Sequence, residues 1–387
     1  RARAATSGLR ADPVLMAGLL NVPVRGAPFA DFMTMKMIGL SQNFPLGGKR
    51  GLRRLIAERE VKIASASWEV IRRDVQRDVK SAFYELAFIG EARTIIRKNQ
   101  ELLVTFIGIA QGRYTLGLTG QQDVLKAQVE ASNLAATAVE LAERERSVKA
   151  KLNSLVGRAP TADIANPSIP PDVRRAAVGS LSSLRFESPA LGSRVADSPL
   201  PALGELQASA LTNNSELRAQ GALISAQSAA LQLTRRERIP DIDVGLQYGQ
   251  RDGYPDMLSA TVSLPIPLQR RSRQSAFVRE SESELTASRF DAEAKANSIR
   301  ADIARLVSQI ERERAQLALT GKVILPQSRA ALNSSIASYQ AGKTEFLGVL
   351  GAQATLFRLE TDYARLVADF ATDIAELERV TGMEVIR

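Results

Sequence analysis

The 387-residue chain contains no cysteine and no histidine. The first absence excludes disulfide bonds and thiol chemistry, and the second removes the commonest metal ligand and general base. Aromatic residues make up only 5% of the chain, and no apolar run approaches the roughly 20 residues of a membrane-spanning helix. The sequence also lacks a phosphate-binding loop and a nucleophile–base pair. We therefore expect a protein that is not an enzyme, with no catalytic residue, no cofactor and no metal site.

The composition favours long helices. Hydrophobic residues reach 45%, and the formal net charge of +9 would suit nucleic acid or anionic lipid. Lysine and arginine are interleaved with aspartate and glutamate along the predicted helices, so we interpret the charge as a solvated helix surface. A nucleic-acid-binding coiled coil is therefore the weakest alternative, and no nucleic-acid partner is expected.

One stretch of the sequence occurs twice, at a constant offset of 225 positions. Tyr114–Gln128 reads Y-T-L-G-L-T-G-Q-Q-D-V-L-K-A-Q, and Tyr339–Gln353 reads Y-Q-A-G-K-T-E-F-L-G-V-L-G-A-Q. In each copy a long helical pattern ends at a glycine, Gly117 or Gly342, and a second helical pattern begins directly after it. Glycine readily takes the positive φ of a tight helix reversal, so each copy predicts the tip of a helical hairpin. The helices expected around the tips are 48–116, 120–157, 269–341 with a kink at Pro326, and 344–381.

Two predicted β-hairpins, 12–44 and 239–266, precede the long helices. In the second, apolar and polar residues alternate on both sides of Asp252-Gly253, which is a strong hairpin signal. Each strand runs about 10 residues with one apolar and one polar face, as transmembrane barrel strands do. A soluble β-sandwich alternates in the same way, but nothing else in the chain is rich enough in β-forming residues to cover these strands. The membrane interpretation is therefore favoured.

The order helix, strand, strand, long helix, tip, return helix thus occurs twice. The first repeat spans 1–158, and the second spans 203–387 and opens with a helix at 203–238. A proline-rich linker, 159–202, joins them. The first repeat shows only the end of the corresponding helix, in 1–10, so the comparison predicts that an N-terminal helical portion is missing from this sequence.

Several motifs carry a family resemblance: the two Y-x-x-G tips, D-V-L-K-A-Q at Asp123–Gln128, L-N-S-L-V-G at Leu152–Gly157, and S-Q-N-F-P-L-G-G-K-R at Ser41–Arg50. Together they resemble the TolC family of outer-membrane efflux proteins over essentially the whole chain. The last motif resembles the heavy-metal-efflux subgroup of that family. The resemblance implies a mainly α fold with a β-barrel part. Long antiparallel helical hairpins would form a periplasmic α-barrel, and four strands per protomer would contribute to a trimeric 12-stranded outer-membrane β-barrel.

The same resemblance implies the function and the partners. The protein would be a passive exit duct in the outer membrane of a Gram-negative-type bacterium, with a large periplasmic extension. It would work as a homotrimer in outer-membrane lipid, with a periplasmic adaptor and an inner-membrane pump of the resistance-nodulation-division type. The main alternative is a periplasmic coiled-coil adaptor or scaffold without a channel, which predicts one helical hairpin and no paired β-hairpins.

The resemblance also implies a periplasmic gate at the tips. Members of the family carry aspartates six and nine positions after the glycine of the second tip, and six after that of the first. Asp123 matches in the first tip, whereas Gly348 and Gly351 occupy the second-tip positions, so this chain departs from the pattern there. The expected gate residues are Asp123, Glu345, Tyr114 and Tyr339. Alternatively, Asp123 is a helix N-terminal carboxylate that interacts with the dipole, and the tyrosines are purely structural.

Two further sets of residues follow from this interpretation. The tip residues expected to contact the adaptor are Gly117, Leu118, Thr119, Gly342, Lys343 and Thr344. In the second β-hairpin, the residues expected to line the barrel lumen are Asp241, Asp243 and Gln247, and those expected to face lipid are Ile242, Val244, Leu246, Leu258 and Val262.

Overall fold

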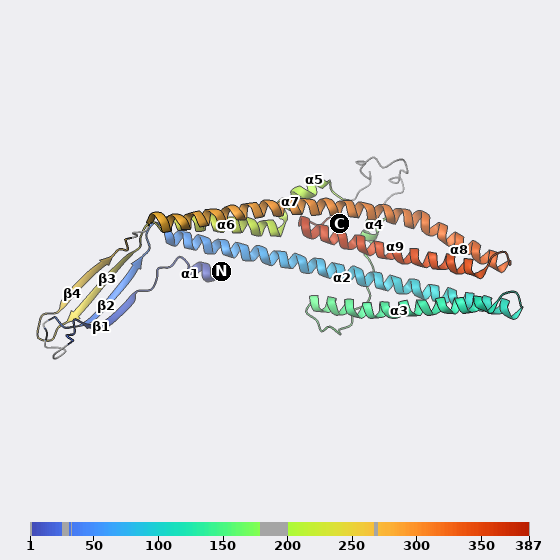
Figure 1. The fold of residues 1–387 in the computed structure, drawn as a ribbon, viewed down its shortest axis with the longest axis horizontal. Coiled ribbons are helices and arrows are strands. Elements are labelled where there is room, and N and C mark those ends of the chain that lie inside the picture. The colour runs from blue at the N-terminus through green and yellow to red at the C-terminus, as the bar shows by residue number, and fades with distance from the viewer. Residues whose placement is uncertain (1, 25–30, 32, 179–199, 267–269, 387) are drawn as a thin grey trace. The chain divides into compact units, whose positions relative to one another are not determined.

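The computed structural model describes residues 2–24, 31, 33–178, 200–266 and 270–386, which form long helices and one four-stranded sheet (Figure 1). In chain order the elements are α1 (Ala2–Thr6), β1 (Val14–Leu20), β2 (Met35–Phe44), α2 (Lys49–Thr115), α3 (Gln121–Leu155), α4 (Pro171–Ala177), α5 (Leu203–Asn213), α6 (Ser215–Arg236), β3 (Ile242–Gln250), β4 (Met257–Ser263), the π-helical turn η2 (Arg270–Gln274), α7 (Ser275–Leu319), the π-helical turn η3 (Thr320–Ile324), α8 (Leu325–Gln340) and α9 (Phe346–Thr381). The predicted fold class is confirmed. Within these residues, no helix has a stretch both apolar and uncharged enough to cross a membrane.

Both predicted helical hairpins are present, α2 with α3 and α8 with α9. The coiled-coil alternative, which requires a single hairpin and no paired strands, is therefore wrong. In the second hairpin the long helix is interrupted by η3, which ends two residues before Pro326. Proline has no N–H and its ring clashes with the carbonyl four residues earlier, here that of Lys322, so a wider π-helical turn accommodates it. The predicted irregularity thus lies one turn before the proline.

The prediction of one helix at 203–238 is wrong. Asn214 separates α5 from α6, and its backbone is extended, with φ −64° and ψ 125°. Its side-chain amide donates to the carbonyl oxygen of Val380 at 2.8 Å. Short polar side chains such as asparagine compete with the hydrogen bonds of the helical backbone. Here the amide of Asn214 bonds to α9 instead, and the helix is interrupted. The predicted start of the long helix at 269 lies outside the described residues.

The compact units do not coincide with the two sequence repeats. Unit 1 contains Arg1–Glu69 and Ser215–Ala296, and unit 2 contains Val70–Asn214 and Asn297–Arg387. Each unit therefore takes one part of each repeat: unit 1 holds both β-hairpins, and unit 2 holds both helical tips.

In unit 1 the four strands are antiparallel, in the order β1-β2-β3-β4. β2 pairs with β3, with Leu40 opposite Leu246, so hairpins from the two repeats join into one sheet. Alternate residues point to opposite faces. The apolar face carries Leu15, Ile38, Leu40, Val244, Leu246, Tyr248, Leu258 and Val262, and the opposite, polar face carries Ser41, Asn43, Asp243, Gln247, Ser259, Thr261 and Ser263.

A buried lysine ties this sheet to the helices of unit 1. Lys49 is the first residue of α2, and its side chain is only 5% exposed. Its Nζ lies 2.6 Å from Oδ1 of Asp241 and 2.5 Å from the carbonyl oxygen of Ile239. The same Asp241 oxygen accepts a hydrogen bond from the N–H of Leu46 at 3.3 Å. The charge of the buried lysine is therefore compensated, and the start of α2 is fixed beside the start of β3.

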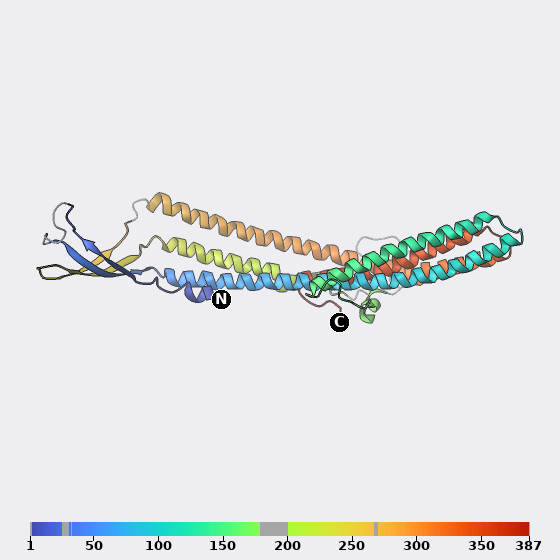
Figure 2. The same cartoon turned by 90° about the horizontal axis from the view of Figure 1, so that it is seen from below.

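In unit 2, α9 is the most buried helix and packs against α3, α4, α5 and α8. In both views the α2–α3 and α8–α9 hairpins lie side by side, with their tips at the same end (Figures 1 and 2). Their shared core includes Phe106, Leu134 and Phe346. Within it, the Nε2 of Gln353 donates to Oδ1 of Asn99 at 2.9 Å. This bond satisfies polar atoms that would otherwise be costly to bury.

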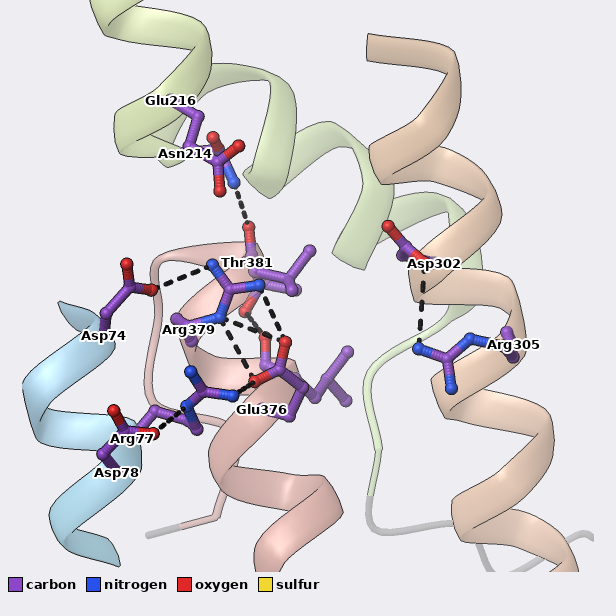
Figure 3. A network of polar contacts seen from close by, with 12 residues as sticks. Asp74, Arg77, Asp78, Asn214, Glu216, Asp302, Arg305, Glu376, Arg379 and Thr381 are labelled. Atoms are coloured by element: carbon purple, nitrogen blue, oxygen red, sulfur yellow. Dashed lines mark hydrogen bonds and ion pairs between the residues drawn. The ribbon is translucent and has the colours of Figure 1, made fainter. Parts of the chain in front are cut away.

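Ion pairs hold the end of α9 against α2 in unit 2 (Figure 3). Arg379 lies 3.3 Å from Asp74 and 2.7 Å from Glu376, and Arg77 lies 3.3 Å from the other oxygen of Glu376. These side chains are partly exposed, so each pair contributes only up to about 1 kcal/mol. These ion pairs join residues that are about 300 positions apart in the chain, and so they hold α9 in register with α2.

Candidate functional site

Both helical tips close with the same hydrogen-bonded turn. In the first tip, the N–H of Gly117 donates to the carbonyl of Tyr114 at 2.9 Å, and the N–H of Leu118 donates to that of Arg113 at 2.9 Å. The second tip repeats both bonds at the same offset, with Gly342 in place of Gly117, and both glycines have φ 72°. This bond pair with a left-handed glycine is the Schellman motif that ends helices. The predicted helix reversals are therefore confirmed.

The two tips are joined through Arg113 and Tyr339. The guanidinium carbon of Arg113 lies 4.8 Å from the centre of the Tyr339 ring. Its Nη1 donates to the carbonyl oxygen of Tyr339 at 2.9 Å and to that of Gln340 at 3.3 Å. Tyr339 is only 3% exposed, and its ring lies 5.2 Å from that of Phe346. An arginine of the first hairpin thus caps the end of α8, where unpaired carbonyls carry partial negative charge.

The predicted gate residues lie in different environments around this junction. Asp123 is half-buried in the first turn of α3. Burial, and then the negative charge of Asp123, raise the pKa of the Tyr339 hydroxyl, whereas the positive charge of Arg113 lowers it. Tyr114 is 47% exposed, and Glu345 is an exposed N-cap residue whose side chain makes no capping hydrogen bond. One protomer therefore brings Asp123 and Tyr339 together and leaves Tyr114 and Glu345 at the surface.

The residues predicted to contact an adaptor lie on the tip loops. Five of them are exposed, namely Gly117, Leu118, Gly342, Lys343 and Thr344, and Thr119 is half-buried. Leu118 is a large apolar side chain that is 61% exposed. An apolar and a basic side chain thus stand in water at the same end of unit 2.

The sheet separates the residues predicted for lipid from those predicted for the lumen. Leu258 and Val262 are 75% and 72% exposed on the apolar face. On the polar face, Asp243 accepts a hydrogen bond from the side-chain amide of Asn43 at 2.7 Å. Asp241 differs, because its carboxylate is engaged by Lys49 at the junction with α2. The two opposed faces are the arrangement that strands need between hydrocarbon and water.

Arg113 is the residue of the tip junction that the sequence did not reveal. One signal could have pointed to it: at the offset of 225, the first repeat has Arg113 where the second has Ser338. A positive charge that breaks the repeat four positions before a tip glycine indicates a role specific to that tip. Among the described residues, no group of three or more acidic side chains is placed to hold a metal ion.

Two adjacent helical tips together with a four-stranded sheet that is apolar on one face give the chain the fold of a TolC-like channel protomer. The solved structure of VceC from Vibrio cholerae matches this fold with a TM-score of 0.78, over 99% of this chain and 89% of that chain, at 18% identity. That likeness concerns the fold alone.

Sequence comparisons point to the same class of protein. The model for "Outer membrane efflux protein" matches residues 206–383. The chain is 25% identical to the cobalt-zinc-cadmium resistance protein CzcC of Cupriavidus metallidurans, over 87% of this chain and 74% of that protein. It is 24% identical to the outer membrane efflux protein BepC of Brucella suis, over 95% and 76%. The family match, both relatives and the fold agree with the outer membrane efflux proteins, and the chain is an outer-membrane exit duct for an efflux pump.

Proposed function

We propose that three copies of this chain form one duct with a 12-stranded barrel in the outer membrane and a helical extension in the periplasm. The duct conducts substrate passively. An inner-membrane pump of the resistance-nodulation-division type drives the transport, and a periplasmic adaptor opens the helical tips. The cobalt-zinc-cadmium resistance protein among the relatives makes metal cations one class of cargo to test.

The four-stranded sheet is the observation that carries this proposal. Among the described residues, β1 pairs only with β2 and β4 only with β3, so the sheet has two open edges. In lipid, each unpaired backbone group costs several kcal/mol. Three sheets of four strands, with β4 of one copy paired to β1 of the next, make twelve strands and leave no edge. The apolar face then meets hydrocarbon, and the face with Asp243 and Gln247 meets the pore.

The tips supply the proposed gate. Threefold symmetry would place three Asp123 carboxylates around the pore axis, with Glu345 nearby, and acidic rings of this kind attract cations. Tyr339 and Arg113 hold the two tips of each protomer together, so the gate opens only when this junction yields. The exposed Leu118, Lys343 and Thr344 provide the surface on which the adaptor acts.

Charge placed on the two faces of the sheet tests the proposal. A lysine on the lipid face costs about 2–4 kcal/mol near the bilayer midplane, so Val244→Lys and Val262→Lys should lower the yield of folded channels at least tenfold. Asp243→Lys should assemble normally and change single-channel conductance and ion selectivity. Val244→Leu is the matched control for assembly. Folding into lipid vesicles and planar-bilayer recording measure both properties, and equal effects of lysine on the two faces of the sheet would contradict the proposal.

A further inference from the structure

Methionines gather on the polar face of the sheet. The chain has six methionines, and four of them lie on this one face: Met16, Met35, Met37 and Met257. Met37 stands opposite Gly18 and Gly249, and Met257 stands opposite Gly249 from the other side, so these residues form one row across all four strands. The opposite face, where apolar side chains are expected, carries none of the four.

Gly249 is the centre of this group. A Cβ built on Gly249 would lie 2.6 Å from Sδ of Met35, so the Met35 side chain crosses directly over the glycine. Met37 and Met257 flank the same glycine on β2 and β4. Neighbouring strands are about 4.8 Å apart, and a methionine side chain has three rotatable bonds. Three thioethers can therefore converge over the space that the missing side chain leaves.

The position of these thioethers is unusual for residues that only fill space. Methionine commonly fills gaps in closed cores, yet Met35 and Met37 are half-buried and Met257 is 42% exposed. Their face also carries Gln247, Ser259 and Thr261, which are suited to water. Because the chain has no cysteine and no histidine, thioethers are its only soft ligands. Thioether sulfur selects soft monovalent cations such as copper(I) over hard or borderline divalent ions.

We propose that Met35, Met37 and Met257 bind a soft monovalent cation, copper(I) or silver(I), at the loop end of the sheet. Met35 opens β2 and Met257 opens β4, so the site lies at the end of the sheet opposite Phe44 and the helices. That this face lines the pore rests on the proposed function, whereas the strand register that places the three methionines around Gly249 does not. The site would bind soft cations weakly and transiently near the outer mouth of the duct. Met16 lies further along the same face.

Silver(I) is the probe for this site, because it is soft, monovalent and stable to oxidation. Silver nitrate is titrated calorimetrically into the detergent-solubilised full chain in chloride-free buffer, and X-ray absorption at the silver edge reports sulfur neighbours. Met35→Leu/Met37→Leu/Met257→Leu keeps apolar volume and removes sulfur, and should weaken silver binding at least tenfold. Met383→Leu, which removes a methionine outside the sheet, is the matched control and should stay within twofold. Zinc(II) should not compete.

The single variant Met257→Leu, at an exposed position, keeps the test decisive if the triple variant does not fold; it should weaken binding at least threefold. Unchanged silver affinity in a folded variant, or no silver bound to sulfur in the wild type, overturns the site. The oligomeric state of the wild type in detergent is measured in parallel. A trimer without silver binding refutes the site alone, whereas a monomer that binds silver refutes the proposed trimeric duct and leaves the site standing.

Discussion

At the scale of single residues, Arg113 decides how the two helical tips are held. It is the one side chain described here that both stacks on the Tyr339 ring and donates to the carbonyls at the end of α8. Hydrogen bonds from a charged donor are worth about 1.5–3 kcal/mol. We expect Arg113→Ala to loosen the tips and raise single-channel conductance in planar bilayers.

Two controls separate this junction from a general effect of charge. Lys126→Ala removes one positive charge from an exposed position on α3 and should leave conductance unchanged. Arg113→Lys keeps the charge but loses the planar fork of donors, so its conductance should lie between those of wild type and Arg113→Ala. If Arg113→Ala conducts as the wild type does, the junction does not hold the gate.

A second residue-scale feature is the buried carboxyl of Glu313 on α7, which is 2% exposed. Burial, and then the negative charge of Asp373 on α9, raise its pKa from 4.5 to about 7, and the nearby Arg312 only partly opposes this. Asp373 itself has a raised pKa, chiefly through burial. The pair therefore prefers to hold a proton where the two helices meet.

This raised pKa predicts how stability depends on pH. The folded protein binds the proton of Glu313 more tightly than the unfolded chain does. The contribution of this group to the free energy of unfolding is therefore complete below pH 4.5 and is lost as the pH rises towards 7. The loss should be on the order of 1–3 kcal/mol. Glu313→Gln should make the thermal unfolding midpoint nearly independent of pH between pH 5 and 8. Glu101→Gln, at an exposed site on α2, should leave the pH dependence as it is in the wild type. If the unfolding midpoint of Glu313→Gln still changes with pH as it does in the wild type, protonation of Glu313 is not the cause of the pH dependence.

At the scale of elements, the tip turns depend on left-handed glycines. Gly342 has φ 72°, a conformation that costs an L-residue with a side chain roughly 1–2 kcal/mol. Gly351 lies inside α9 with open space around it. Gly342→Ala should therefore lower the stability of unit 2, while Gly351→Ala should raise it by about 0.5–1 kcal/mol. Thermal unfolding of the two variants measures both effects, and a Gly342→Ala variant as stable as the wild type would show that the turn does not require glycine.

The features that sequence predicted well at this scale are local ones. The glycine at each tip, the Asp252-Gly253 turn and the alternation along β3 act within a few residues, so pattern and spacing are enough to find them. The break at Asn214 was missed although Asn213, Asn214 and Ser215 form a run of helix-ending side chains. The apolar periodicity continues on both sides of Asn214, so the pattern alone predicts one unbroken helix.

The contacts that sequence did not predict join distant parts of the chain. Arg113 and the carbonyl of Tyr339 are 226 positions apart, and Gln353 and Asn99 are 254 apart. The grouping of three methionines around Gly249 likewise needs the register of β2, β3 and β4. No spacing rule specifies such pairs, because they depend on which faces of separate elements meet.

At the scale of the whole molecule, each compact unit combines one part of the first sequence repeat with one part of the second. Both β-hairpins enter unit 1 and both helical tips enter unit 2, because a two-stranded hairpin gains stability only when further strands extend it. The same reasoning continues beyond one chain, since a four-stranded sheet with open edges and an exposed apolar face is still incomplete. In the proposed trimer, sister copies in a membrane would supply what is missing.

Native mass spectrometry and electron microscopy of the detergent-extracted protein test this central claim most directly. We predict one species of three chains, seen end-on as a threefold particle with a hollow centre. A monomer that stays dispersed in buffer without detergent, with its strands hidden from solvent, would contradict the account.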